Sequence, residues 1–268
     1  MAIGLLLIDI QNDFIDGSLA VNDAQAILPT VYKLVDDYPL DLIVVSQDWH
    51  PPTHISFASS HKDETRKTFT TFDLVHPLQP AQPIKQELWP VHCVQGTRGA
   101  DIEAGLAQRL EAVSPGCLKG ASSSEFNGDD EPEGSGQKQV VLIQKGTEAN
   151  ADGYSAFSLN GYLGFTSLPR TLFSWTAAKP LSSSSRSSST QQTDKIDTLI
   201  LCGLATDYCC LRTAIDARKF GFRTIVVEDG VRGVGNDTVN AAWEEMERWG
   251  CERVKTAEEA WQAAARQP

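Results

Sequence analysis

Short apolar runs alternate with amphipathic stretches along this chain. The runs have the length of strands that are buried on both faces, and they cover residues 4–8, 40–46, 140–143, 198–201, 224–228 and 251–255. The amphipathic stretches carry apolar residues at helical spacing, and they cover residues 24–35, 101–112, 207–219, 237–249 and 257–266. Because strands and helices alternate without hairpin signals, the pattern predicts a doubly wound α/β fold, with a mainly parallel sheet of six strands and helices on both faces.

Two low-complexity stretches interrupt this alternation. Residues 114–138 are rich in glycine, serine and acidic residues, and residues 177–193 are dominated by serine. Such compositions cannot bury a core, so both stretches are predicted to be flexible insertions. Residues 55–87 are polar and irregular, and their length favours a lid or wall over a passive connection. No break in composition separates two self-sufficient halves, so we expect a single domain over residues 1–268.

Charge and composition exclude several classes of partner. The net charge of −12 and the isoelectric point of about 4.8 argue against binding to nucleic acid or to an anionic membrane. No apolar run approaches the roughly 20 residues that cross a bilayer, and the N-terminus leads into a strand without signal-peptide features. We therefore expect a cytoplasmic protein, and in that reducing compartment its six cysteines should be free thiols.

Chemically active side chains follow three of the predicted central strands. Asp9 follows the first strand, Lys145 follows the third, and Cys209 lies where strand 198–201 turns into helix 207–219. Each has an ordinary explanation taken alone: a turn or cap residue, a solvated surface charge and a core thiol, respectively. Parallel strands, however, place their carboxyl ends on one edge of the sheet, where ligands bind in open α/β folds. Together, the three side chains would supply a base, a cation and a nucleophile.

Cys209 is the candidate nucleophile because of its place at the start of a helix. The helix dipole favours a thiolate there, and the backbone N–H groups of the first turn can bind an oxyanion. All five histidines precede residue 93, so a Cys–His pair in which the histidine follows the cysteine is not available. Asp9 is therefore the candidate base. Its charge opposes the effect of the dipole, so we expect proton transfer during attack rather than a permanent thiolate.

A second group of residues suggests a metal site. Asp48 and His50 lie two apart on an extended segment and would point the same way, which is a weak signal for Zn²⁺ or a similar divalent cation. His92 could supply a third ligand, with the flat apolar face of Trp89 beside it. The alternative is a surface histidine next to a tryptophan that covers the core.

Five stretches of the sequence resemble the nicotinamidases of the isochorismatase-like hydrolase superfamily, which are zinc-containing cysteine amidases that convert nicotinamide to nicotinate and ammonia. The stretches are spread over the fold in family order: LLLIDIQNDF at 5–14, SQDWHPPTHISF at 46–57, LWPVHCVQGTRGAD at 88–101, QKGTE and the following YSAF within 144–157, and CGLATDYCCLRTA at 202–214. The two low-complexity stretches match nothing in the family core.

The resemblance implies a role for individual residues. The catalytic triad would be Asp9, Lys145 and Cys209. One divalent metal ion, expected to be Zn²⁺, would be held by Asp48, His50 and His92, with His54 as the local candidate for a further ligand. The backbone N–H groups of Ala205 and Cys209 would form the oxyanion hole, which in this family requires a cis peptide bond, here Leu204–Ala205. The walls of the pyridine pocket would be Phe14, Trp89 and Tyr154.

The reaction implied by the resemblance is hydrolysis of nicotinamide through a Cys209 thioester, with the metal orienting the pyridine nitrogen, as part of NAD salvage. The expected partner is thus a small molecule, and the sequence leaves open whether the protein forms a homo-oligomer. Two alternatives remain at this point. One is a hydrolase of other small amides or of isochorismate on the same fold, and the other is a non-catalytic zinc- or thiol-sensing protein that uses Cys209 and Cys210.

Overall fold

The computed structural model describes residues 2–119, 138–176 and 195–266. Of the stretches predicted as insertions, residues 120–137 and the whole of 177–193 lie outside the described residues, whereas residues 114–119 form turns after a helix. Within the described ranges, no helix has the length and apolar character needed to cross a membrane.

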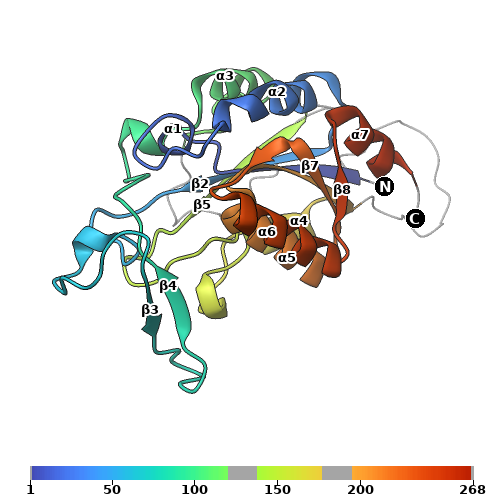
Figure 1. The fold of residues 1–268 in the computed structure, drawn as a ribbon. Coiled ribbons are helices and arrows are strands. Elements are labelled where there is room, and N and C mark those ends of the chain that lie inside the picture. Colours follow the sequence, from blue (N-terminus) through green and yellow to red (C-terminus); the bar gives the residue numbers. More distant parts are fainter. Residues whose placement is uncertain (1, 120–137, 177–194, 267–268) are drawn as a thin grey trace, which may run out of the picture.

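The six predicted strands form one parallel sheet, which confirms the predicted fold class (Figure 1). The strand order is β5-β2-β1-β6-β7-β8. The bounds are Ala2–Ile8 for β1, Leu42–Asp48 for β2, Gln139–Lys145 for β5, Ile196–Leu204 for β6, Arg223–Arg232 for β7 and Glu252–Val254 for β8. Four strands are longer than the predicted apolar runs, as β5 is because Gln144 and Lys145 continue it. Strand β2 has the predicted length but is shifted by two residues, so that it ends at Asp48.

Helices cover both faces of the sheet, and β1 shows why its residues are apolar throughout. Leu5 and Leu7 pack into one core and Leu6 and Ile8 into the other, since successive side chains of a strand point to opposite faces. The first core is closed by α2 (Leu28–Asp37), α3 (Ala104–Val113) and α7 (Ala257–Ala265), and the second by α4 (Leu168–Ser174), α5 (Leu211–Lys219) and α6 (Asn236–Arg248). In Figure 1 these two sets of helices lie above and below the sheet.

Three helices differ from the prediction at their starts. The stretch 24–35 begins with a 3₁₀ turn (Ala24–Ile27) before α2, and a π-helical turn (Thr206–Cys210) precedes α5. Helix α3 begins at Ala104 rather than at residue 101, because the Glu103 carboxylate accepts hydrogen bonds from the N–H groups of Gly105 and Leu106.

A hairpin that the sequence did not predict lies in the irregular stretch 55–87. Strands β3 (Thr71–Leu74) and β4 (Ile84–Glu87) pair antiparallel and project away from the main sheet (Figure 1). Each strand has only four residues and β3 has no buried residue, so the stretch lacks the apolar pattern that marks a core strand. A short helix that the pattern also missed, α1 (Asn12–Ile15), follows β1.

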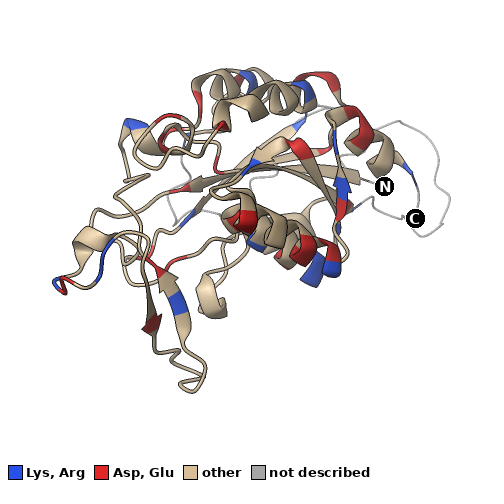
Figure 2. Cartoon of the chain, in the orientation of Figure 1, with Lys and Arg blue, Asp and Glu red and all other residues tan. Residues whose placement is uncertain are grey.

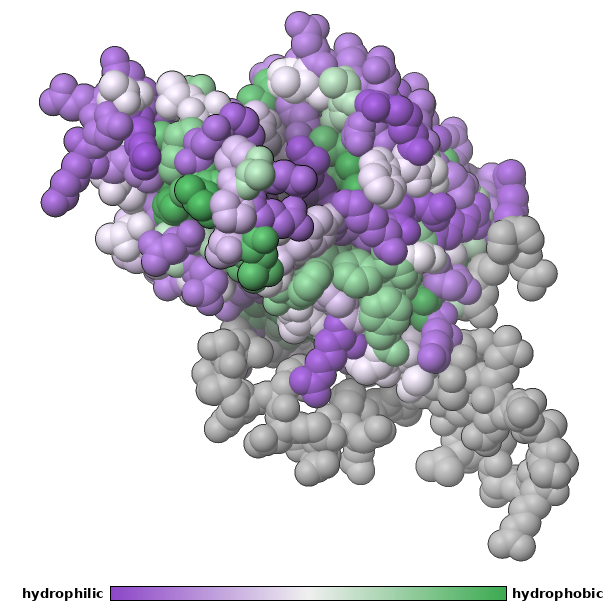
Figure 3. Space-filling view, turned by 90° about the horizontal axis from the view of Figure 1, so that it is seen from below, coloured by the Kyte–Doolittle hydropathy of each residue, from purple (hydrophilic) through white to green (hydrophobic). Residues whose placement is uncertain are grey.

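The charged residues lie mainly on the outer sides of helices and in loops (Figure 2). The face seen from below is largely hydrophilic but carries an apolar area (Figure 3). Phe165 and Phe173, both more than half exposed, each contact the ring of Phe220 beside α5. Few charged side chains in the described part of the protein are buried, and most of those lie near the carboxyl ends of the strands.

Candidate active site

The side chain of Lys145 lies at the centre of a buried polar cluster at the carboxyl edge of the sheet. Its Nζ is 2.9 Å from Oδ2 of Asp9, 2.5 Å from Oδ1 of Asp48 and 3.5 Å from Sγ of Cys209. Asp9 follows β1, Asp48 ends β2, and Lys145 ends β5 directly opposite Asp48. Since all four residues are at most 6% exposed, one ammonium group serves two carboxylates and a thiol away from solvent. The structure thus brings the three predicted catalytic side chains together.

Asp9 is held in place by Ser46, a β2 residue that the sequence did not single out. The Ser46 hydroxyl donates a 2.6 Å hydrogen bond to Oδ1 of Asp9 and accepts one of 3.1 Å from the Asp9 backbone N–H. The Asp9 backbone has φ of +50°, which is uncommon for a residue with a side chain. Ser46 therefore fixes one carboxylate oxygen, while the other faces Lys145.

Cys209 lies in the π-helical turn rather than in the first turn of an α-helix. In this turn the N–H of Cys210 donates to the carbonyl of Ala205 at 3.1 Å. The Leu204–Ala205 peptide bond is cis, as the resemblance implied. Just before it, a Cβ on Gly203 would lie 2.1 Å from the carbonyl oxygen of Ile8, so only glycine lets the end of β6 approach the end of β1 this closely. Single π-helical turns occur frequently at functional sites.

The burial of this cluster decides its protonation. Burial raises the pKa of the Cys209 thiol well above its usual value, although Lys145 opposes this. Burial also raises the pKa of Asp9, against the lowering effect of Lys145. For Lys145 itself, burial lowers the pKa, but Asp48 and Asp9 outweigh it and hold the pKa well above the usual range. The resting site therefore holds an ammonium group and a neutral thiol, with Asp9 placed to take up the thiol proton.

Asp48, His50 and His92 form a buried group whose ligand atoms all lie within 4.8 Å of one another. Nδ1 of His50 is 2.9 Å from the Gly146 carbonyl, and Nδ1 of His92 is 2.7 Å from the Pro90 carbonyl. A carbonyl accepts only from a protonated nitrogen, so in both rings Nε2 is left to bind a cation. A Cβ on Gly146 would lie 2.3 Å from the His50 ring, so glycine is required there.

The electrostatics of this group also suit a cation. Burial raises the pKa of Asp48, but Lys145 and His50 outweigh it and hold the pKa far below the usual range. Burial, together with His50, lowers the pKa of His92 to about 4, so this imidazole is neutral. Burial lowers the pKa of His50, but Asp48 raises it more, which shows that positive charge is favoured at this position. One carboxylate and two imidazoles are a donor set that fits Zn²⁺.

His54, the predicted candidate for a further ligand, lies beside this group rather than within it. Its ring stacks on that of His50 at 4.0 Å, and its two nitrogens lie 2.7 Å from the Ser56 hydroxyl and 3.3 Å from the Ala151 carbonyl. It belongs instead to a second buried group, with His50 and Asp152. Asp152 was not singled out from the sequence, because it lies in a polar loop between Lys145 and Tyr154.

The three aromatic residues predicted to wall the pocket divide between two places. Trp89 donates its indole N–H to the Tyr154 hydroxyl at 3.1 Å, and both rings contact Tyr208. Phe14 instead lies next to His92, with 5.6 Å between ring centroids. Tyr208, which precedes Cys209, is an aromatic neighbour that the sequence did not indicate.

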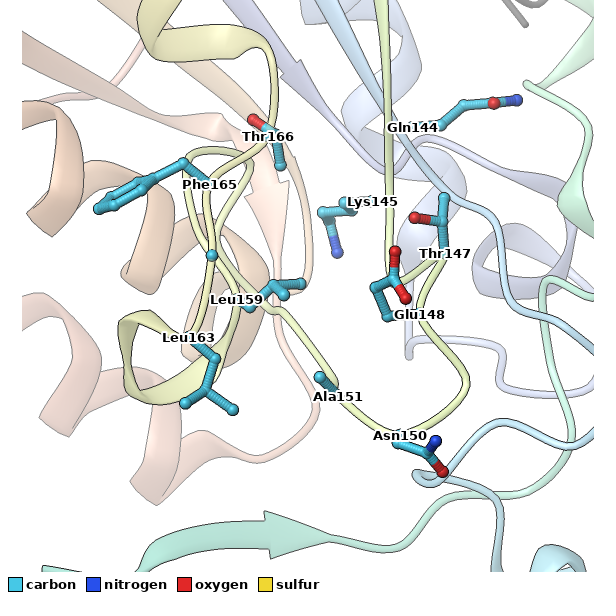
Figure 4. Close-up of a pocket in the computed structure, with 12 residues that line it drawn as sticks. Gln144, Lys145, Thr147, Glu148, Asn150, Ala151, Leu159, Leu163, Phe165 and Thr166 are labelled. Atoms are coloured by element: carbon cyan, nitrogen blue, oxygen red, sulfur yellow. The ribbon is translucent and has the colours of Figure 1, made fainter. Parts of the chain in front are cut away.

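A cavity of about 480 Å³ adjoins the site, between residues 144–151 and the loop 159–166. Figure 4 shows Lys145 and Glu148 on one side of it, with Leu159 and Thr166 on the other. Its wall includes Gly146 and Ala151, whose carbonyl groups contact the imidazoles of His50 and His54.

Comparisons of this chain with family models, with curated proteins and with solved structures all indicate the same family. The isochorismatase domain family matches residues 179–259. A nicotinamidase of Acinetobacter baylyi is 33% identical over 254 residues, which cover 94% of this chain and 92% of the relative. The solved structure of the yeast nicotinamidase bound to the inhibitor nicotinaldehyde is 26% identical, with a TM-score of 0.72 and coverage of 95% of this chain and 100% of that one.

A pyrazinamidase of Pyrococcus horikoshii in complex with zinc is likewise 26% identical, with a TM-score of 0.61 and coverage of 95% and 99%. The likenesses extend over nearly the whole length of each relative, so they concern the sheet, the helices and the site at its carboxyl edge together. The chain belongs to the nicotinamidase family of isochorismatase-domain amide hydrolases.

Proposed function

We propose that this protein hydrolyses nicotinamide to nicotinate and ammonia through a thioester on Cys209, in the cytoplasm, as a step of NAD salvage. The observation that carries the proposal is the convergence of Asp9, Asp48 and Cys209 on the Lys145 ammonium group, within 3.5 Å of its Nζ. The substrate is taken from the relatives, which are nicotinamidases and a pyrazinamidase.

In the first half-reaction, Sγ of Cys209 attacks the carboxamide carbon while Asp9 accepts the thiol proton. Lys145 favours the ionised form of Asp9 and so opposes the effect of burial, because the ammonium group lies 2.9 Å from its carboxylate. The backbone N–H groups of Ala205 and Cys209 bind the oxyanion of the tetrahedral intermediate. Asp9 then gives its proton to the departing ammonia as the C–N bond breaks, and the acyl group stays on sulfur.

In the second half-reaction, water replaces ammonia. Asp9, ionised again, takes a proton from a water molecule as its oxygen attacks the thioester carbon. The C–S bond breaks, the carboxylate product forms, and the sulfur recovers its proton through Asp9. One carboxylate thus serves both steps, which suits a base that Ser46 and Lys145 hold on either side.

Asp48, His50 and His92 are the residues that would hold a divalent cation, for which zinc is the candidate. When bound, such a cation supplies a Lewis acid that can orient a pyridine nitrogen. The chain's own contribution to substrate binding comes from Trp89, Tyr154 and Phe14, whose rings would pack against the heteroaromatic ring and exclude water.

The test is to measure ammonia release from nicotinamide and from maleamate, and conversion of isochorismate. We expect turnover of nicotinamide and a loss of at least about 10³-fold in kcat for Cys209→Ala, because the nucleophile is removed. Cys210→Ala, which removes the neighbouring buried thiol, is the control and should retain most of the activity. Turnover of maleamate or isochorismate alone would refute the proposal, and a thiol-sensing role would survive Cys209→Ala through Cys210.

A further inference from the structure

We propose that Asp152 is a positioning residue that strengthens the binding of a divalent cation to Asp48, His50 and His92 without being one of its ligands. The inference rests on the metal site of the proposed function. It concerns a buried carboxylate that the mechanism above does not use.

The Asp152 carboxylate is buried without a cationic partner in the described part of the chain. The side chain is 5% exposed, and its oxygens accept hydrogen bonds from the Gly153 N–H at 2.8 Å and from the Gln86 side-chain amide at 2.9 Å. Neither donor carries a charge. A carboxylate in this position is costly unless positive charge lies nearby.

The groups that face Asp152 are imidazoles on the metal side of the site. A carboxylate oxygen of Asp152 lies within 4.8 Å of a ring nitrogen of His50 and of one of His54. The two nitrogens of His54 face the Ser56 hydroxyl and the Ala151 carbonyl. His50, by contrast, belongs both to this group and to the group with Asp48 and His92. The negative charge of Asp152 therefore acts on any cation that His50 binds.

The charges of the whole site lead to the same conclusion. Among the described residues, the buried carboxylates of the site are Asp9, Asp48 and Asp152, and its one buried ammonium group is Lys145. In the form that binds a metal, the thiol and the imidazoles are neutral. The three carboxylates and the ammonium group then give the site a net charge of −2, which is an excess of two negative charges. One divalent cation neutralises this excess, and removal of the Asp152 charge would leave the cation-bound site with a net positive charge in a medium of low dielectric constant.

The position of Asp152 is fixed by its neighbours in the chain. The Ala151 carbonyl contacts His54, the Gly153 carbonyl accepts from Nζ of Lys145 at 3.2 Å, and the Tyr154 hydroxyl accepts from Trp89. Residues 151–154 thus contact the imidazoles, the catalytic cluster and the aromatic wall in succession, which holds the carboxylate at a constant distance from His50.

The experiment measures the Zn²⁺ dissociation constant of the metal-stripped, full-length protein by competition with a chromogenic chelator. For Asp152→Asn we expect binding that is about 10–100-fold weaker, the usual effect of losing an outer-shell partner. Asp152→Glu keeps the charge and should recover part of the affinity. If Asp152→Asn does not fold, Asp152→Ala takes its place with the same expectation.

Asp216→Asn is the control for the loss of a buried carboxylate outside the site. Asp216 is equally buried, at 4% exposed, and its carboxylate accepts from the Ser158 and Tyr162 hydroxyls, but it lies on α5 and has Nζ of Lys219 3.5 Å away. Its replacement should leave zinc affinity unchanged. Native affinity in a folded Asp152 variant, or equal weakening in Asp216→Asn, would overturn the inference. A loss as complete as that of Asp48→Asn would make Asp152 a ligand and overturn it too.

The readout also separates this inference from the proposed function. If the native protein binds zinc but releases no ammonia from nicotinamide, the proposed function fails while the affinities of the Asp152 variants still decide the inference. If the native protein turns over nicotinamide but binds no divalent cation, the inference fails and the amidase activity stands.

Discussion

At the scale of single residues, the protein is unusual in how much charge it buries. Lys145 is 2% exposed and contacts two carboxylates that are themselves buried. Charged side chains are almost never fully buried unless they are paired, so each member of this cluster depends on the others. Burying these charges lowers the stability of the fold, and the proposed catalytic role accounts for this cost better than a structural role does.

Replacing Lys145 by methionine should abolish activity and destabilise the protein by about 3–5 kcal/mol, because Asp9 and Asp48 lose their shared cation. Urea unfolding in zinc-containing buffer measures the change in the free energy of unfolding. Lys33→Met is the control: Lys33 is half exposed and pairs with Asp37 on the surface of α2, so its loss should leave the free energy of unfolding nearly unchanged. Equal stability of the two variants would contradict this account of Lys145.

At this scale, the sequence was most informative where a residue type was improbable in its place. An aspartate, a lysine and a cysteine at strand ends stand out from the buried apolar runs before them, and the structure brings these three side chains together. Ser46 and Asp152 could not be found in this way. A serine in a strand and an aspartate in a polar loop are ordinary residues, and only the folded chain shows which groups they face.

At the scale of secondary-structure elements, the turn between β6 and α5 holds Cys209, the proposed nucleophile. It is anchored by Asp207, whose carboxylate accepts hydrogen bonds from the N–H groups of Val234 and Gly235 and from the Thr238 hydroxyl, at the start of α6. The turn that holds Cys209 is therefore tied to a helix that follows it by nearly thirty residues.

We expect Asp207→Ala to lower kcat and to destabilise the protein by about 1–3 kcal/mol, since three hydrogen bonds to a carboxylate are lost and the turn loses its anchor. Glu103→Ala, which removes the N-cap of α3, should cost about 1 kcal/mol with kcat unchanged. Urea unfolding and steady-state kinetics on both variants make the comparison. A parallel loss of kcat in Glu103→Ala would mean that general destabilisation, not the turn, accounts for the effect.

Helical pattern alone does not distinguish a π-helical turn from an α-helix. The apolar spacing in 207–219 predicted one continuous helix, whereas the cis peptide and Gly203 set the path of the chain before it.

The β3–β4 hairpin was not predicted, for a different reason. Its strands have only four residues each, and β3 has no buried residue, so they are too short to produce a readable apolar pattern.

At the scale of the whole molecule, polar side chains from distant parts of the chain lie together at the carboxyl edge of the six-stranded sheet. Residues 9, 48, 145 and 209 meet there because β1, β2, β5 and β6 are parallel neighbours. The histidines come from the loop after β2 and from the stretch after β4, so a metal ion at this place would link segments that the sheet alone does not hold together.

Metal removal should therefore affect both activity and stability. Chelation should abolish nicotinamide hydrolysis, and readdition of zinc should restore it. With free zinc at 100 times its dissociation constant, the bound state should be more stable by about 2.7 kcal/mol, which urea unfolding with and without chelator measures. Asp48→Asn, which removes a ligand, should show little response to the chelator. Coincident unfolding curves for native protein in both conditions would exclude a metal that stabilises the fold.

The order of apolar and polar positions determined the fold class of this protein, because a parallel sheet covered on both faces requires continuous apolar strands and one-sided helices. The same pattern located polar residues at the ends of strands, and family resemblance named the roles proposed for them. Only the tertiary structure decided which carboxylate faces which cation, because Lys145 is 97 positions from Asp48 and 136 positions from Asp9 in sequence. Distances of that kind are set by strand order and register, which local sequence does not encode.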